Sequence, residues 1–315
     1  MEEIKVSVIC TAYNHEKYIA KALESFLMQK TSFKFEVIVH DDASTDKTAD
    51  IIKEYEQKYP DIIKPIYQKE NQYSQGVHIT ASLMIPKAKG EFIAFCEGDD
   101  YWTSPNKLQL QYECMNKYPQ CSLVAGNAVR VSENGEYISI YSNKGYKEGI
   151  YTAKDIISDL SMFPMASMFF RKSYYSENSL FLENVQNFDY IHKALLSTQG
   201  DVYFLDEKLS AYRQAAKGSW TERIAQNKEK FETHIKKSIQ AFEKLDEYRN
   251  YKYTELIQEE IIRRKFNVKE LNCDIKALKK EPYRKIYNKR SFKWKVLLYI
   301  KAYCPGLYSF LIKRR

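Results

Sequence analysis

An acidic segment, Glu97-Gly98-Asp99-Asp100, directly follows the apolar run Phe92–Phe95. An apolar run of this kind predicts a buried strand, and open α/β sheets bind their ligands at the carboxyl ends of the strands. Adjacent carboxylates repel each other, and a hard divalent cation with oxygen ligands relieves that repulsion. An isolated Asp-Asp pair is more often a solvated turn. The interpretation therefore depends on which residues share this edge of the sheet.

Polar residues also follow two earlier strand-like runs. Residues 11–14 (Thr-Ala-Tyr-Asn) come after the run 5–10, and residues 41–44 (Asp-Asp-Ala-Ser) come after the run 35–39. Because the carboxyl ends of parallel strands lie at one edge of a sheet, we expect both clusters to meet the acidic segment. An aromatic ring, an acceptor carboxylate and a metal-binding pair at one edge suit a nucleotide diphosphate.

The order of the predicted elements indicates an α/β fold. Between the strands lie segments with helical periodicity, at residues 15–29, at 44–59 and before Pro119. This alternation predicts a Rossmann-like, mostly parallel central sheet with helices on both faces. From about Arg223 the chain is charged and has no glycine until Gly306, which predicts helices. We expect an α/β domain over residues 1–222 and a helical, basic C-terminal extension over residues 223–315.

The composition is that of a folded protein with a large core, since 44% of the 315 residues are hydrophobic and 14% are aromatic. The six cysteines form no CxxC pair, which argues against a zinc site and against a disulfide framework. The N-terminal residues lack a signal-peptide pattern, and no uninterrupted apolar run reaches the roughly eighteen residues of a membrane span. The sequence therefore predicts a cytoplasmic protein.

Basic residues are concentrated at the C-terminal end. Residues 276–315 hold 13 Lys or Arg and one acid, Glu281, a balance of +12; the other 275 residues hold 36 basic and 40 acidic residues, a balance of −4. A basic tail suits an anionic surface, and membrane lipid and nucleic acid both present one. Its lysines do not gather on one helical face. We expect peripheral association with the inner face of a membrane, and nucleic acid binding is the alternative.

Three motifs, in this order and at these intervals, resemble family 2 glycosyltransferases of the GT-A fold. They are residues 6–14 (VSVICTAYN), residues 37–46 (VIVHDDASTD) and the acidic segment with Tyr101 and Trp102. The resemblance covers about residues 4–220. It implies an inverting, metal-dependent enzyme that moves a sugar from a UDP-type nucleotide sugar to a hydroxyl. The acceptor it implies is a glycan or lipid-linked glycan in bacterial surface polysaccharide synthesis.

The resemblance also implies how the nucleotide is bound. Thr11, Ala12 and Tyr13 would hold the uracil ring. Asp42 would accept a hydrogen bond from the imide N–H of the base, and Asp41 would be structural.

At the reacting end, the resemblance places Asp99 beside the ribose or the metal shell and makes Asp100 the ligand of Mn²⁺ or Mg²⁺. Such a metal stabilises the charge of the leaving diphosphate. The resemblance places the general base in residues 185–191, where Asp189 is the candidate and a helix N-cap is its structural alternative. Arg213 is a candidate phosphate ligand, although an arginine at a strand end more often forms a surface ion pair.

Other classes of function fit less well. A nucleotidyltransferase has a glycine-rich loop after its first strand, and residues 11–14 contain no glycine. No GxGxxG follows any strand, which argues against dinucleotide-dependent oxidoreduction. An inactive relative would be expected to lose some of its site carboxylates, and this chain keeps Asp42, Asp99, Asp100 and Asp189.

Overall fold

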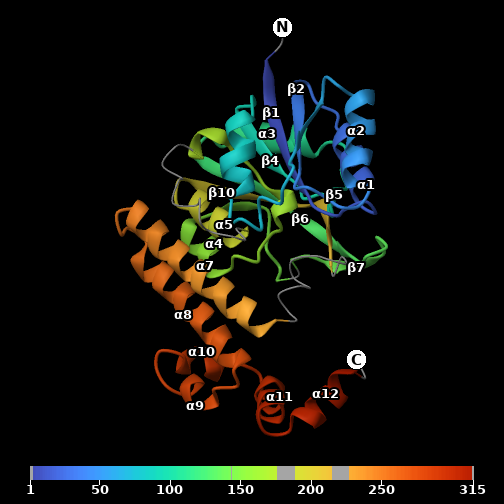
Figure 1. The fold of residues 1–315 in the computed structure, drawn as a ribbon. Coiled ribbons are helices and arrows are strands. Elements are labelled where there is room, and N and C mark those ends of the chain that lie inside the picture. The colour runs from blue at the N-terminus through green and yellow to red at the C-terminus, as the bar shows by residue number, and fades with distance from the viewer. Residues whose placement is uncertain (1–2, 143, 176–188, 215–226, 314–315) are drawn as a thin grey trace. The chain divides into compact units, whose positions relative to one another are not determined.

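The structure is a computed structural model that describes residues 3–142, 144–175, 189–214 and 227–313. The chain divides into two compact units, Met1–Arg223 and Ile224–Arg315. The first unit contains the sheet, and the described part of the second is built from helices (Figure 1).

Four strands form the parallel part of the sheet, in the spatial order β3-β2-β1-β4. In β1, Ala12 lies opposite Asp41 of β2, and Ile9 lies opposite Phe95 of β4, so the carboxyl ends of these strands meet at one edge. The central residues of β1, β2 and β4 are buried on both faces, as a parallel sheet covered by helices requires. The strands are β1 (Ile4–Ala12), β2 (Lys34–Asp41), β3 (Ile63–Tyr67) and β4 (Phe92–Phe95).

The rest of the sheet is mixed. β9 pairs antiparallel with both β4 and β6, and β6 runs parallel to β10. Short strands pair antiparallel with the two long ones: β5 and β8 with β10, and β7 with β6. These strands are β5 (Tyr101–Trp102), β6 (Cys121–Val131), β7 (Tyr137–Ile140), β8 (Gly149–Tyr151), β9 (Phe169–Arg171) and β10 (Asp201–Arg213). Because β5 directly follows the acidic segment, its pairing brings that segment to the end of β10.

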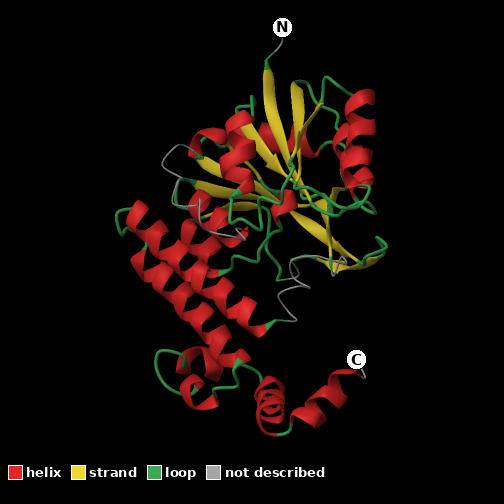
Figure 2. Ribbon diagram, viewed as in Figure 1, coloured by secondary structure: helices red, strands yellow, loops and turns green. Residues whose placement is uncertain are grey.

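Helices cover both faces of the sheet (Figure 2). Leu23, Ile52 and Leu108, from α1, α2 and α3, join one core cluster with side chains of β1 and β2. On the other face, His192 of α5 contacts Phe95 edge to face, with 5.6 Å between the ring centroids. These helices are α1 (Ile19–Leu27), α2 (Thr48–Lys58), α3 (Lys107–Lys117) and α5 (Asp189–Ser197), and α4 (Ala153–Ser158) lies beside α5.

Short helical turns complete the first unit. The stretch before β4 forms a π-helical turn, Ile79–Met84, and a 3₁₀ turn, Ile85–Lys87. Pro86 lacks the N–H that would continue a regular helix. Two further 3₁₀ turns, Met165–Ser167 and Lys172–Tyr174, flank β9.

In the second unit, the long helices α7 and α8 lie side by side (Figure 1). The helices α9, α10 and α11 pack with α8 around a small apolar cluster of Phe266, Ile275, Leu278, Tyr287 and Leu298. No helix in the described part of the chain is long and apolar enough to cross a bilayer. The helices are α7 (Lys228–Tyr248), α8 (Thr254–Leu271), α9 (Ile275–Leu278), α10 (Arg284–Lys289), α11 (Phe292–Tyr303) and α12 (Pro305–Lys313).

Candidate active site

The segment that follows β1 contacts both of its neighbours at the carboxyl edge of the sheet. The Asp42 N–H donates to the Ala12 carbonyl at 3.0 Å, and the Gly98 N–H donates to the Thr11 carbonyl at 2.9 Å. Residue 98 must be small, because a Cβ there would lie 2.9 Å from His15 Nδ1. The structure therefore brings together the ends of β1, β2 and β4, as the sequence predicts.

The loops after β1 and β2 are fastened to each other. The Asn14 N–H donates to Ser44 Oγ at 2.9 Å, and the Thr45 N–H donates to Asn14 Oδ1 at 2.8 Å. The His15 N–H donates to Thr48 Oγ1 at 2.8 Å. Asn14 has a φ of 57°, a left-handed conformation that asparagine adopts more readily than most residues. The two loops thus form one hydrogen-bonded platform.

The three residues predicted to hold the base lie on this platform. Ala12 is buried, whereas Thr11 and Tyr13 are half-buried. The Thr11 and Ala12 carbonyls are used by the neighbouring segments. A half-buried tyrosine at this edge has a ring face of the kind on which a nucleobase stacks.

Asp42 is buried, and the loop after β3 binds its carboxylate. Oδ1 accepts a hydrogen bond from the Gln72 N–H at 2.8 Å, and Oδ2 accepts one from the Tyr73 N–H at 3.1 Å. A carboxylate has about four acceptor positions, so about two are left for a ligand. This loop therefore holds in place the carboxylate that is predicted to accept a hydrogen bond from the nucleobase. No feature of the sequence indicates the contact between the loop and Asp42.

Two other aspartates near this edge, Asp41 and Asp46, differ in how completely the protein hydrogen-bonds their carboxylates. Asp41 Oδ2 accepts from the Ser44 N–H at 3.3 Å, but Oδ1 is buried and has no hydrogen-bond partner among the described residues. Burial raises the pKa of Asp41. Partial burial disfavours the charged form of Asp46 too, but hydrogen bonds from Thr48 and Glu16 outweigh it and lower the pKa of Asp46.

The acidic segment after β4 carries poorly compensated negative charge. Glu97 and Asp99 are half-buried and Asp100 is buried. The main-chain N–H of Arg213 donates to Asp100 Oδ1 at 2.7 Å. Burial raises the pKa of Asp100 well above its usual range, and the charge of Asp99 adds to the shift. Burial raises the pKa of Glu97 similarly, and there the charge of Asp189 adds most.

Arg213 closes the end of β10 onto this segment. Its Nε donates to the Asp99 carbonyl at 2.8 Å, and one terminal nitrogen donates to the carbonyls of Ser132 and Glu133 at 3.1 and 2.6 Å. Its guanidinium also lies over the Tyr18 ring, 4.7 Å from the centroid. This side chain is buried and its hydrogen bonds go to main-chain carbonyls, so the geometry favours a structural role over the phosphate contact considered from the sequence.

Asp189 is the first residue of α5 and is exposed to solvent. Neighbouring protein that displaces water from the carboxylate raises the pKa of Asp189, while the positive charge of Lys193, one turn later, opposes the shift. Lys193 is buried and donates to the carbonyls of Leu160 and Phe163 at 3.0 and 2.5 Å. Burial lowers the pKa of Lys193 to about 8 despite three nearby acids. The rest of the predicted base segment, residues 185–188, lies outside the described residues.

Sequence reasoning missed Lys193, although its spacing of four from Asp189 on a predicted helix puts both on one face.

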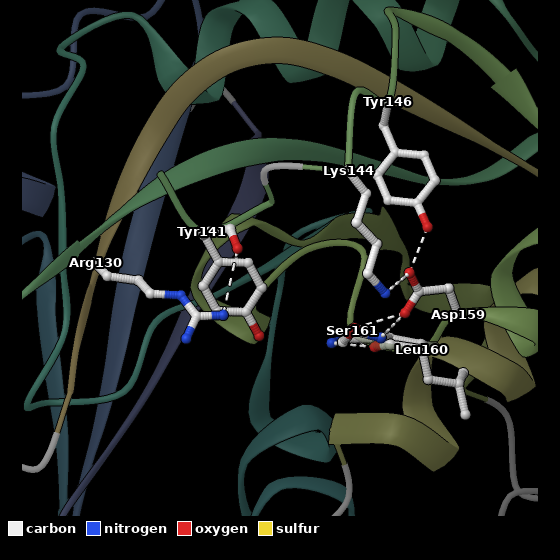
Figure 3. A network of polar contacts seen from close by, with 8 residues as sticks. Arg130, Tyr141, Lys144, Tyr146, Asp159, Leu160 and Ser161 are labelled. Atoms are coloured by element: carbon white, nitrogen blue, oxygen red, sulfur yellow. Dashed lines mark hydrogen bonds and ion pairs between the residues drawn. The ribbon is translucent and has the colours of Figure 1, made fainter. Parts of the chain in front are cut away.

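Sequence reasoning also missed a polar network beside α4 (Figure 3). Asp159 Oδ2 accepts from Lys144 Nζ at 2.5 Å and from the Tyr146 hydroxyl, and Oδ1 accepts from Ser161 Oγ at 2.5 Å. Partial burial opposes ionisation of Asp159, but these hydrogen bonds outweigh it and lower its pKa to about 2.

Figure 3 also shows Arg130 against Tyr141. The guanidinium lies 4.7 Å from the ring centroid and donates to the Tyr141 carbonyl at 3.3 Å. Burial raises the pKa of Tyr141, and the negative charge of Asp189 contributes to that shift. Tyr212 contacts the same ring edge to face, with 5.4 Å between the centroids. Aromatic side chains therefore lie within electrostatic reach of the candidate base.

The acidic segment fits a divalent metal by its chemistry. Its side-chain donors are carboxylate oxygens, which suit Mg²⁺ and Mn²⁺, and the raised pKa values of Glu97 and Asp100 mark negative charge that a cation would relieve. Within the described residues, no three His, Cys, Asp or Glu side chains converge as a ready-made cage. A metal at Asp100 would therefore take further ligands from a diphosphate and water, as Mg²⁺ commonly does.

Comparison with other sequences identifies the family. The model of glycosyl transferase family 2 matches residues 7–177, a little more than half of the chain. An uncharacterized protein of Mycobacterium tuberculosis is 32% identical over 233 residues, which cover 72% of this chain and 64% of the relative, so the chain spans less than two thirds of that protein's length. The putative teichuronic acid biosynthesis glycosyltransferase TuaG of Bacillus subtilis is 37% identical over 110 residues, 35% of this chain and 41% of TuaG.

Solved structures share the fold. S. aureus TarS 1-349 in complex with UDP has a TM-score of 0.54 and 22% identity, covering 80% of this chain and 73% of that one. The mannosyltransferase PcManGT from Pyrobaculum calidifontis, in complex with GDP-Man and Mn²⁺, has a TM-score of 0.53 and 15% identity, covering 95% and 87%. These similarities confirm the predicted α/β, GT-A architecture with a helical C-terminal region. Together with the motifs at the sheet edge and the match over residues 7–177, they establish that this chain belongs to glycosyl transferase family 2.

Proposed function

We propose that the protein is an inverting, metal-dependent glycosyltransferase that uses a UDP-linked sugar and glycosylates a hydroxyl of a glycan or lipid-linked glycan. The observation that carries the proposal is the meeting of three polar segments at the carboxyl edge of β1, β2 and β4. This edge is where open α/β sheets bind nucleotides. Family membership supports the reaction class, and the UDP bound to TarS supports the donor class.

In this proposal Tyr13 stacks on the base, Thr11 and Ala12 line its pocket, and Asp42 accepts its imide N–H. The contacts of Asp42 with Gln72 and Tyr73 orient the carboxylate before the nucleotide arrives. Uracil offers this carboxylate one ring N–H, whereas guanine would offer two donors to it. Nucleotide selectivity is therefore measurable at this single residue.

At the reacting end, Asp189 takes the proton of the acceptor hydroxyl. The acceptor oxygen bonds to the anomeric carbon from the face opposite the leaving group, while the bond from that carbon to the diphosphate oxygen breaks. A carboxylate with a raised pKa, such as Asp189, is a better base than an ordinary aspartate. Asp99 would lie toward the ribose or the metal shell, and Asp100 would hold Mn²⁺ or Mg²⁺. A bound metal supplies Lewis-acid stabilisation of the leaving diphosphate.

We also propose that the protein works in surface polysaccharide synthesis at an anionic membrane surface. The name of the relative TuaG supports the pathway class. The balance of +12 over residues 276–315 supports the location, because each Lys or Arg near an anionic leaflet contributes about 1 kcal/mol of attraction.

The test is a panel of UDP-linked sugars, GDP-linked sugars and nucleoside triphosphates, each measured for protection of the full chain against thermal unfolding with Mn²⁺ and with a chelator. We expect a UDP-linked sugar to raise the unfolding temperature in Mn²⁺ and to do so less with the chelator. The sugar that protects best is then assayed for metal-dependent release of UDP.

Each alternative result has a distinct meaning. Protection by GDP-linked sugars alone would refute the uridine assignment and leave a transferase. Protection by nucleoside triphosphates alone would favour a nucleotidyltransferase. Equal protection and turnover with the chelator would refute the metal role of Asp100.

A further inference from the structure

One face of α11 leaves large apolar side chains in solvent. Phe292 is 82% exposed, Tyr303 is 73% exposed, and Val296 is also exposed. At about 100° per residue, these three positions fall within about 40° of one another around the helix axis. They lie on one side of α11, toward its two ends, and we call these three side chains the α11 stripe. Tyr299, between them on the same side, is half-buried and stacks on Tyr303 with 6.0 Å between the ring centroids.

The other side of α11 is packed, and this fixes which way the stripe faces. Leu298 is buried in the cluster with Phe266, and Trp294 stacks on Phe266 with 6.1 Å between the ring centroids. Trp294 Nε1 also donates to Glu270 Oε1 at 2.9 Å. Because α11 is held to α8 by these contacts, the exposure of the stripe is a property of the folded unit.

The next helix repeats the pattern. Leu307, Phe310 and Leu311 of α12 are all exposed, and their spacing of three and four residues puts them on one helical face. α12 contacts α11. Several large apolar side chains from two successive helices are therefore in solvent, more than scattered exposed residues would account for.

Lysines flank the α11 stripe. Around the helix, Lys293 and Lys295 lie about 100° and about 60° to either side of Phe292. Lysines in these positions can lay their carbon chains along an apolar surface and place their ammonium groups at the level of the phosphates of lipid headgroups. An apolar face bordered by lysines on a short helix is the pattern of a helix that lies in a membrane interface.

We propose that α11 and α12 insert their apolar faces into the headgroup region of an anionic bilayer. This inference rests on the proposed membrane association and adds to it a hydrophobic component made by named residues. The charge of the region selects an anionic lipid surface, since residues 276–315 carry a balance of +12. The helices are too short to span the bilayer, so the attachment is peripheral.

The experiment measures partitioning of the full chain onto vesicles of phosphatidylglycerol and phosphatidylcholine, and onto phosphatidylcholine alone. The test variant carries Phe292→Ser, Val296→Ser and Tyr303→Ser. Burial of one large apolar side chain changes partitioning by about tenfold, so we expect the variant to bind anionic vesicles at least about tenfold more weakly. At about 0.5 M salt, where charges are screened within a few ångströms, the wild type should retain part of its binding.

The matched control is Tyr251→Ser, because Tyr251 is an aromatic residue of the same unit, 65% exposed, outside α11 and α12. It should bind like the wild type. For charge, Lys293→Ser should weaken binding about fivefold, and Lys244→Ser on α7 should have less effect. If the triple variant loses its helical structure, the single change Phe292→Ser, at the most exposed of these positions, replaces it.

Normal binding by the triple variant, with complete release by salt, would overturn the hydrophobic insertion and leave electrostatic membrane association standing. No binding of the wild type to anionic vesicles would overturn both. Loss of self-association in the triple variant without loss of vesicle binding would assign the stripe to a second copy of the chain. Binding of a single-stranded oligonucleotide by the wild type but not by the triple variant, with no vesicle binding, would assign the stripe to nucleic acid.

Discussion

The two sides of the candidate site handle negative charge in different ways. On the β1–β2 side, Asp42 accepts hydrogen bonds from the Gln72 and Tyr73 N–H groups, and Asp46 is satisfied well enough for its pKa to be lowered. On the β4–α5 side, the pKa values of Glu97, Asp100 and Asp189 are raised, since the loss of water around these carboxylates and the repulsion between them outweigh the nearby cations.

This difference separates two tasks. A side whose carboxylates are already hydrogen bonded keeps its shape when a ligand binds, which suits recognition of a flat base. A side with excess negative charge gains most from a cation and from proton transfer, which suits the chemical step. The predictions below test this division, beginning with the change expected to matter most.

Asp189→Asn should have the largest effect. It removes the proposed base and keeps the shape of the side chain, so transfer should fall by about 10²- to 10⁴-fold. The measurement is kcat for sugar transfer at saturating donor, beside the unfolding temperature. Asp206→Asn, an exposed carboxylate on β10, is the matched control and should keep wild-type turnover. Turnover of Asp189→Asn at the wild-type rate would show that another group accepts the proton.

Asp100→Asn should come next, with a loss of about a hundredfold or more in Mn²⁺-dependent transfer. The amide oxygen can still accept the Arg213 N–H, and a like-charge repulsion disappears, so the unfolding temperature should stay the same or rise. Reduced activity at undiminished stability is the signature of a functional carboxylate. A parallel fall of both would instead assign Asp100 to the scaffold, and the exposed Asp50→Asn on α2 controls for loss of charge.

Asp42→Asn should weaken nucleotide binding more than it slows chemistry. A hydrogen bond to a charged acceptor is worth about 1.5–3 kcal/mol, which corresponds to about a 10- to 150-fold weaker affinity for UDP. The side-chain NH₂ of the new asparagine also faces either a loop N–H or the N–H of the base, and two donors cannot form a hydrogen bond with each other. Calorimetric titration with UDP measures the affinity, and an unchanged dissociation constant would remove Asp42 from the base pocket.

The sequence predicts the parts of this site that depend on periodicity. Alternating strands and helices place the ends of β1, β2 and β4 at one edge, and the structure has them there. It does not predict contacts made by irregular segments. The Gln72–Tyr73 loop on Asp42 and the Arg213 contacts to carbonyls join residues far apart in the chain, through main-chain groups that carry no sequence signal. Strands of two to four residues, such as β5 and β8, are too short to show a period.

Lys193→Met tests the electrostatic balance on the β4–α5 side. The positive charge of Lys193 lowers the pKa of Asp189, so its removal should raise that pKa further. Activity needs ionised Asp189, and the acidic limb of the kcat/KM profile should therefore move to higher pH. Lys107→Met is the matched control, because Lys107 is equally buried, with its pKa lowered to about 7, but does not act on Asp189. Both variants should lose stability, and only Lys193→Met should move the limb.

The smallest effect tests an exception on the β1–β2 side, where Asp41 has a raised pKa and a buried oxygen without a partner among the described residues. In the folded protein the ionised form of Asp41 is disfavoured, which lowers the free energy of unfolding at neutral pH. This effect disappears as pH falls below the pKa that Asp41 has in the unfolded chain. Asp41→Asn should therefore raise the unfolding temperature by a few degrees at pH 7, and the gain should shrink in acid.

Asp46→Asn should show the opposite sign. Its folded pKa is lowered, so the ionised carboxylate stabilises the protein above the unfolded pKa, and this contribution is lost as pH falls through the folded pKa. The substitution should lower the unfolding temperature at pH 7 and matter little in acid. Thermal unfolding of both variants from pH 7 down to about pH 2 checks the pair, because the contribution of Asp46 is lost only below its unfolded pKa of about 3.9. If both variants changed the unfolding temperature in the same direction, this would contradict the view that the hydrogen bonding of a carboxylate, and not its distance from the acidic segment, decides whether the folded protein tolerates its charge.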